Sequence, residues 1–152
     1  MKHAKTFFPL VMLATMVSAC DDDPTGPAST PCTDDTGTVS VTVGSGLQPV
    51  IDWDPECAVA LVLVEEDAGD QWLITTDEDD WSDAGTANLI VPPVTYGVAP
   101  AAAMEPYPAL PLRTGVTYEV ILWRVLPAGS SAQCQQTFGN NVCLMALQEF
   151  SR

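Results

Sequence analysis

The sequence predicts an all-β fold, an antiparallel seven-stranded β-sandwich, over residues 38–152. Three observations predict it. Apolar residues in this part follow a period of two, the apolar runs are rich in β-branched residues, and clusters of turn-forming residues separate the runs at short intervals. No segment here has an apolar stripe with the helical period of 3.6 residues. A stretch of this length is sufficient for one hydrophobic core.

Seven strands are expected, each bounded by turn residues. In chain order they cover residues 38–43, 50–53, 58–65, 71–76, 88–98, 116–126 and 143–150. Gly44-Ser45-Gly46, Asp54-Pro55 and Ala68-Gly69-Asp70 end the first three strands. Ser82-Asp83-Ala84-Gly85 separates the fourth strand from the fifth, and Ala128-Gly129-Ser130 follows the sixth.

The first twenty residues resemble the signal sequence of a bacterial lipoprotein. A basic start at residues 2–5 precedes an apolar run at residues 7–17, and Val17-Ser18-Ala19-Cys20 is similar to a lipobox. The run is shorter than the about 20 residues that a transmembrane helix needs. The resemblance implies that residues 1–19 are removed and that a lipid on Cys20 anchors the protein in the bacterial cell envelope. It leaves open whether the inner or the outer membrane holds the anchor.

Residues 20–37 are expected to form a disordered tether between the anchor and the domain. This stretch begins with Asp21-Asp22-Asp23-Pro24 and continues with small residues and prolines, without an apolar period. The expected organisation is therefore a signal sequence at residues 1–19, an acidic, proline-rich tether at residues 20–37 and a β-domain at residues 38–152.

The chain is strongly acidic, with 20 acidic residues against five lysines and arginines and a net charge of −15. Cleavage before Cys20 leaves three arginines as its strong cations. Such a charge repels nucleic acid and anionic lipid headgroups, so no nucleic-acid partner is expected. The charge suits a solvated acidic surface above all, and composition leaves open the binding of cations or of basic partners.

Several kinds of catalytic site are excluded after cleavage, because the one histidine and both lysines lie in residues 1–19. A Ser-His-Asp or Cys-His site, a Schiff-base lysine and a histidine-containing zinc site all need a residue that the remaining chain lacks. A carboxylate pair of the kind that hydrolyses glycosides remains available. Because 20 acidic residues make such a pair unavoidable, it carries little information, and neither a catalytic residue nor a cofactor is expected.

Four cysteines remain beyond Cys20, namely Cys32, Cys57, Cys134 and Cys143. An even number in an exported domain predicts two disulfides, for which three connectivities exist. A metal site made of four thiolates is the alternative. It is disfavoured because the ligand pairs two to four residues apart that are typical of such sites are missing.

Two motifs resemble parts of a fibronectin type III domain, one of the immunoglobulin-like folds. Val50-Ile51-Asp52-Trp53-Asp54-Pro55 is similar to the second strand with its core tryptophan, and residues 112–120 are similar to the run into the sixth strand. The resemblance implies that Leu112 and Tyr118 form a tyrosine corner. The chain departs from the family in its cysteines and in Thr114, which stands where the family often has proline. Domains of this family mostly act as spacers or binding modules, and fold is not function.

In that topology the four cysteines share one pole of the sandwich. The resemblance therefore implies the disulfides Cys32–Cys57 and Cys134–Cys143, although the sequence leaves crossed pairings open. The loop at residues 133–141 is then held at this pole. We expect the disulfides mainly to stabilise the domain, and a rigid, presented binding loop is the alternative.

The third and sixth strands are apolar on both faces, so their outer face must be covered. Because the tyrosine-corner resemblance points Tyr118 inward, Ile121, Trp123 and Val125 of the sixth strand are expected to point outward. Either Leu61 and Leu63 of the third strand or their neighbours lie alongside, and we take Leu61 and Leu63 as the candidates. We expect the Ala/Pro-rich link at residues 99–111 to fold over this face. An exposed patch for a partner or ligand and a surface for self-association are the alternatives.

The acidic run at residues 77–83 contains a weak calcium candidate, Asp77, Asp79 and Asp83. The run lacks the central glycine and the terminal glutamate of an EF-hand loop, so a solvated acidic loop is expected instead. Trp72 and Trp81 are expected to anchor this loop, with stacking on a sugar as the alternative.

Together these features predict a lipid-anchored, non-catalytic binding or assembly module of the bacterial envelope. Its expected partners are the membrane, through the lipid on Cys20, and an envelope protein or a glycan. One alternative is a structural accessory subunit, held in an envelope complex through the face that contains Trp123. Another is a carboxylate-based hydrolase that acts on glycans.

Overall fold

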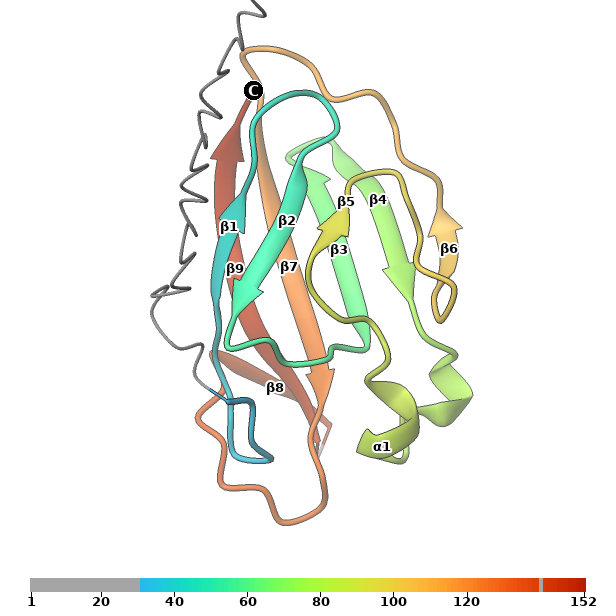
Figure 1. The fold of residues 1–152 in the computed structure, drawn as a ribbon, viewed down its shortest axis with the longest axis vertical. Coiled ribbons are helices and arrows are strands. Elements are labelled where there is room, and N and C mark those ends of the chain that lie inside the picture. The colour runs from blue at the N-terminus through green and yellow to red at the C-terminus, as the bar shows by residue number, and fades with distance from the viewer. Residues whose placement is uncertain (1–30, 140) are drawn as a thin grey trace, which may run out of the picture.

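Two antiparallel sheets pack against each other in the computed structural model, which describes residues 31–139 and 141–152 (Figure 1). The smaller sheet, in the order β1-β2-β5, consists of β1 (Ser40–Val43), β2 (Val50–Asp54) and β5 (Val94–Thr95). The larger sheet has the order β6-β4-β3-β7-β9-β8. Its strands are β3 (Leu61–Glu66), β4 (Gly69–Thr75), β6 (Met104–Tyr107), β7 (Thr117–Val125), β8 (Gln136–Phe138) and β9 (Val142–Ser151). The all-β, antiparallel prediction is confirmed.

One hydrophobic core lies between the sheets, because alternate side chains of each strand point inward. Ile51 and Trp53 of β2 face Val120 and Leu122 of β7, and all four are buried. The buried indole N–H of Trp53 donates a hydrogen bond of 2.7 Å to the carbonyl oxygen of Cys57. Each fully buried large apolar side chain contributes about 1.5–3 kcal/mol, so the core accounts for most of the stability of the domain.

The described residues form nine strands rather than the expected seven. The strand expected at residues 88–98 is reduced to β5, because Pro92-Pro93 has no backbone N–H groups for a ladder. Before the prolines, Ile90 makes only an isolated bridge to Val59. Between β4 and β5 the chain instead forms a 3-10 turn, η1 (Glu78–Asp80), and a short helix, α1 (Ala84–Ala87).

The link at residues 99–111 does not fold over the outer face of the larger sheet, so that prediction is wrong. Instead it contributes β6, which pairs with β4 at the edge of the sheet. The link is fastened there by the indole N–H of Trp72, which donates 2.7 Å to a Glu105 carboxylate oxygen. Leu110 N also donates 2.9 Å to the carbonyl oxygen of Gln71. The link therefore widens the sheet and leaves its outer face open.

The folded part begins before Thr38, where the sequence pattern placed its start. Residues 31–37 have no strand, but they contact the rest of the domain through hydrogen bonds and a disulfide. This segment is held by backbone groups and one cysteine and has no apolar period, so its sequence resembles that of the tether before it. The expected signal sequence, Cys20 and residues 21–30 lie outside the described residues. Within the described part of the chain, no helix is long and apolar enough to cross a membrane.

Candidate functional site

A row of apolar side chains crosses the outer face of the larger sheet, which we call the apolar row. Leu63 of β3 lies opposite Leu73 of β4 and Ile121 of β7. The row continues to Tyr107 of β6, opposite Leu73, and to Leu147 of β9, opposite Ile121. Neighbouring strands lie about 4.8 Å apart, so five side chains from five strands extend over about 19 Å.

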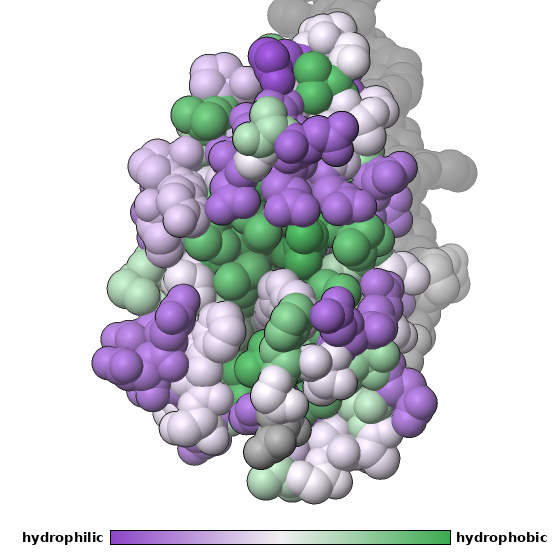
Figure 2. All heavy atoms as spheres, turned by 180° about the vertical axis from the view of Figure 1, so that it is seen from behind, coloured by the Kyte–Doolittle hydropathy of each residue, from purple (hydrophilic) through white to green (hydrophobic). Residues whose placement is uncertain are grey.

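The apolar row is open to solvent at both ends. Tyr107 is 51% exposed and Leu147 is 45% exposed, while Leu63, Leu73 and Ile121 between them are part-buried. Figure 2 shows this face as a hydrophobic area bordered by hydrophilic residues. A strand with one solvated face alternates apolar and polar residues, so a continuous apolar row on the outer face departs from the pattern of a sheet face that only meets water.

A second apolar group lies two residues further along β3 and β7, on the side of the apolar row away from the carboxylates. Leu61 is opposite Trp123, and the ring centroid of Trp123 lies 4.5 Å from that of Phe138 in β8. Trp123 and Leu61 are part-buried, and Phe138 is half-exposed. Four of the five residues expected on the outer face therefore lie there, and this group widens the apolar row at the end that β8 borders.

The expectation that Val125, the fifth residue, lies on the outer face is wrong, because this residue is fully buried. It packs with Ala60 and Ala87 in a small separate cluster, where α1 covers the end of β7. Asn88 holds this arrangement. Its side-chain NH₂ group donates 2.7 Å to the Val125 carbonyl, and its side-chain oxygen accepts 2.9 Å from the Val125 N–H. The sequence pattern missed this cover because α1 is too short to show a helical period.

A row of carboxylates lies directly beside the apolar row, two residues further along β3, β7 and β9 and three residues further along β4. Glu65 is opposite Glu119, Glu119 is opposite Glu149, and Asp70 is opposite Glu65 across a β-bulge. We call these four residues the carboxylate row. Two residues of a strand cover about 7 Å, so each carboxylate lies within reach of a ligand on the apolar row. Like charges placed directly opposite each other destabilise a sheet, so folding alone does not favour this arrangement.

The carboxylate row has a measurable electrostatic consequence. Partial burial raises the pKa of Glu65, and the neighbouring charges of Asp70 and Glu119 raise it further. The row borders an open depression of about 490 Å³. The depression is lined by Glu65, Glu66, Asp67, Gly69, Thr117, Tyr118, Glu119 and Glu149. Arg113 lies beside it and donates hydrogen bonds of 2.7 and 2.8 Å to the two carboxylate oxygens of Glu66.

Two of the three carboxylates of the weak calcium candidate, those of Asp77 and Asp83, act as caps of short helical segments. Asp77 accepts a hydrogen bond of 3.1 Å from the backbone N–H of Asp79 at the start of η1. Asp83 accepts 2.9 Å from the backbone N–H of Gly85 at the start of α1. Across residues 31–139 and 141–152, no three histidine, cysteine or acidic side chains converge as metal ligands do.

The two tryptophans near this loop are held inside the protein. Trp72 is fully buried, and its ring meets that of Tyr96 edge-on at 5.3 Å. Trp81 is part-buried and donates from its indole N–H to the hydroxyl of Thr76 at 3.1 Å. Trp81 therefore fastens the acidic loop to Thr76, whereas Trp72 fastens the link at residues 99–111 through Glu105 rather than the loop.

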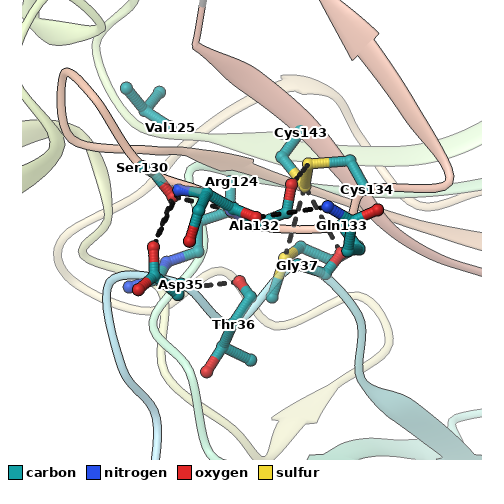
Figure 3. Close-up of a disulfide and its surroundings, with 12 residues drawn as sticks. Asp35, Thr36, Gly37, Arg124, Val125, Ser130, Ala132, Gln133, Cys134 and Cys143 are labelled. Carbon is teal, nitrogen blue, oxygen red and sulfur yellow. Dashed lines mark hydrogen bonds between the residues drawn. A yellow bond between two sulfur atoms is a disulfide. The ribbon is translucent and has the colours of Figure 1, made fainter.

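The structure contains two disulfides, Cys32–Cys57 and Cys134–Cys143, with Cα–Cα distances of 5.0 and 5.5 Å. Both lie near the same end of the domain, as the sandwich topology implied. Figure 3 shows the second disulfide beside residues 35–37. Gly37 allows this close approach, because a Cβ atom at this position would lie 2.5–2.7 Å from backbone atoms of Gln133.

Arg124 joins the N-terminal segment to the larger sheet at this pole. Its guanidinium is buried and donates 2.9 Å to the Thr33 carbonyl and 3.2 Å to the Thr36 carbonyl. Burial lowers the pKa of Arg124, which remains charged at neutral pH. Nearby, the Ser131 backbone N–H donates 2.8 Å to the Asp35 carboxylate and lowers the pKa of Asp35. These polar contacts and the two disulfides hold residues 31–37 against the rest of the domain.

The chain matches no protein-family model, and comparisons with curated proteins and with solved structures return no match.

Proposed function

We propose that this protein is a lipid-anchored component of the bacterial envelope whose single domain is a non-catalytic binding or assembly module. The contact surface in this proposal is the apolar row together with Trp123. One observation carries the proposal. Five apolar side chains from five neighbouring strands form a continuous row on the outer face, and the two at its ends, Tyr107 and Leu147, are about half exposed.

A fibronectin type III-like fold is part of the proposal, and three observations support it. The orders β1-β2-β5 and β4-β3-β7-β9 are those expected for the two sheets of such a domain. Trp53 of β2 is buried in the core. The hydroxyl of Tyr118 accepts 2.7 Å from the backbone N–H of Arg113, next to buried Leu112, which is the contact expected of a tyrosine corner.

The proposed anchor and the open sheet face fit one another. A lipid on Cys20 would hold the domain close to a membrane, where other envelope proteins are concentrated. The domain itself is acidic and is repelled by anionic headgroups, so its open face is available to proteins rather than to lipid. A tether that ends at the Cys32–Cys57 disulfide joins the anchor to the domain at the disulfide pole.

Photo-crosslinking in the native membrane tests the proposal. A photo-reactive amino acid is placed at Leu147, on the apolar row, in the full-length protein. The matched control carries it at Val50, which is equally exposed at 45% but lies on the smaller sheet. We expect a discrete protein adduct from position 147 and none from position 50. Equal labelling from both positions, or no protein adduct from position 147, would refute the proposed contact surface.

The stability of the captured complex separates a binding module from an accessory subunit. A complex that co-purifies from detergent without crosslinking would make the protein a stable subunit of a larger assembly. A complex seen only after crosslinking would make it a transient binding module.

A further inference from the structure

The two rows on the outer face of the larger sheet define the chemistry of what binds there. We propose that the partner presents a cationic amphipathic α-helix, which lies across the strands with its apolar stripe on the apolar row and its lysines or arginines over the carboxylate row. The inference rests on the proposed function and adds to it the class of partner segment.

The spacing of the apolar row suits a helix. An α-helix advances 5.4 Å per turn, and the strands beneath it lie about 4.8 Å apart. A helix perpendicular to the strands therefore places about one turn over each strand. The about 19 Å between Tyr107 and Leu147 accommodates about 13 helical residues at 1.5 Å each, with apolar residues at a spacing of three or four.

The carboxylate row favours a helix with positive charges on the flank that lies over it. Glu65, Glu119 and Glu149 lie in a line parallel to the apolar row, about 7 Å to one side of it. Lysine and arginine side chains on one flank of a helix reach over such a distance, while their alkyl stems stay on the apolar surface. The carboxylates also lie in a line, strand after strand, and this arrangement suits several separate cations of a polypeptide better than one ion.

The charge distribution disfavours other occupants of this face. A second copy of the chain carries the same net charge of −15 and would bring another carboxylate row toward the first. An anionic lipid surface is repelled for the same reason. Burial, and after it the charges of Asp70 and Glu119, raises the pKa of Glu65, and cations above the row would relieve the part due to repulsion.

The test uses the crosslink from position 147 in the full-length protein and removes the charges of the row. Glu65→Gln/Glu119→Gln keeps the shape of the side chains and removes two repelling charges, so the domain still folds. Glu56→Gln/Glu78→Gln is the control, because it makes the same change in net charge at exposed residues in the β2–β3 loop and in η1. Mass spectrometry identifies the crosslinked segment of the partner.

We expect the captured segment to carry apolar residues every three or four positions with lysines or arginines on one flank. The adduct yield should fall about tenfold in Glu65→Gln/Glu119→Gln, stay unchanged in the control and fall in about 0.5 M NaCl. An unchanged yield in the first variant, or a captured segment without cations, overturns the cationic helix and leaves the proposed function standing. A second copy of the chain as the adduct also overturns the cationic helix. The absence of any protein adduct removes the proposed function as well.

Discussion

Glu65 and Glu119 lie directly opposite each other on β3 and β7, two residues along each strand from the apolar pair Leu63 and Ile121. Their carboxylates share one face, and the pKa of Glu65 is raised by burial, by Asp70 and by Glu119. A raised pKa means that the folded protein holds the proton of Glu65 more tightly than the unfolded chain does. Ionisation of Glu65 therefore destabilises the fold, and the destabilisation disappears as the pH falls through the raised pKa.

Glu119→Gln should make the domain more stable at pH 7, because it removes a like charge opposite Glu65. We expect the free energy of unfolding to increase by about 0.5 kcal/mol. The gain should shrink as the pH falls through the raised pKa of Glu65 and should vanish below the ordinary glutamate pKa of about 4.3, because Glu65 is then protonated in the folded and in the unfolded chain. Urea unfolding of the two proteins across this pH range measures the difference. Glu56→Gln, at an exposed loop position, is the control, and an equal gain there would contradict the explanation.

Tyr118→Phe should destabilise the domain by about 1 kcal/mol, because it leaves the backbone N–H of Arg113 without its acceptor. The ring itself should stay in place against Phe150, whose centroid lies 5.5 Å away. Tyr107→Phe is the matched control at an exposed tyrosine and should leave the melting curve unchanged. An unaltered melting curve for Tyr118→Phe would count against the tyrosine corner.

Gly37→Ala should destabilise the disulfide pole, because the added Cβ atom would meet the backbone of Gln133 at 2.5–2.7 Å. Backbone cannot rotate away as a side chain can, so we expect a loss of about 1–3 kcal/mol in thermal or urea unfolding. Gly85→Ala adds the same methyl group near only the Asp83 side chain, at 3.4 Å, and should be neutral or slightly stabilising. Equal effects of the two substitutions would rule out the close approach as the cause.

Cys20→Ser tests the proposed anchor. We expect the variant to be soluble or unprocessed rather than lipid-anchored, and not to partition into detergent as the unaltered protein does, because serine cannot accept the thioether-linked lipid. Ser29→Ala, in the expected tether, should partition like the unaltered protein. Partitioning of Cys20→Ser into detergent would show that something other than a lipid on this residue holds the protein at the membrane.

The secondary structure was predictable where local pattern controls it. Strands β1, β2, β3, β4, β7 and β9 lie within or close to their expected ranges, because alternation of apolar residues and turn residues at the ends are local signals. β6 and β8 were not predicted. Each pairs through its backbone with the edge of the larger sheet, and all of its residues are exposed. Neither strand therefore has the alternation of apolar and polar residues that identifies a strand in the sequence.

The candidate site was predictable only in part. Leu61, Leu63, Ile121 and Trp123 followed from the double-sided apolar character of two strands. Leu73, Tyr107 and Leu147 did not, because membership of the apolar row depends on which residue of a neighbouring strand lies opposite. The carboxylate row has the same origin, since its members are far apart in the chain and meet only through strand register.

Three properties of this protein follow from the amino-acid order alone. The chain is acidic, its larger part has the pattern of an all-β domain, and its start resembles that of a lipoprotein. These properties depend on composition and on neighbours along the chain. The alignment of an apolar row with a row of carboxylates, and the burial of Val125 beneath α1, required the folded chain. Strand pairing joins residues of distant sequence position, and a shift of register by one residue would exchange the two faces of a strand.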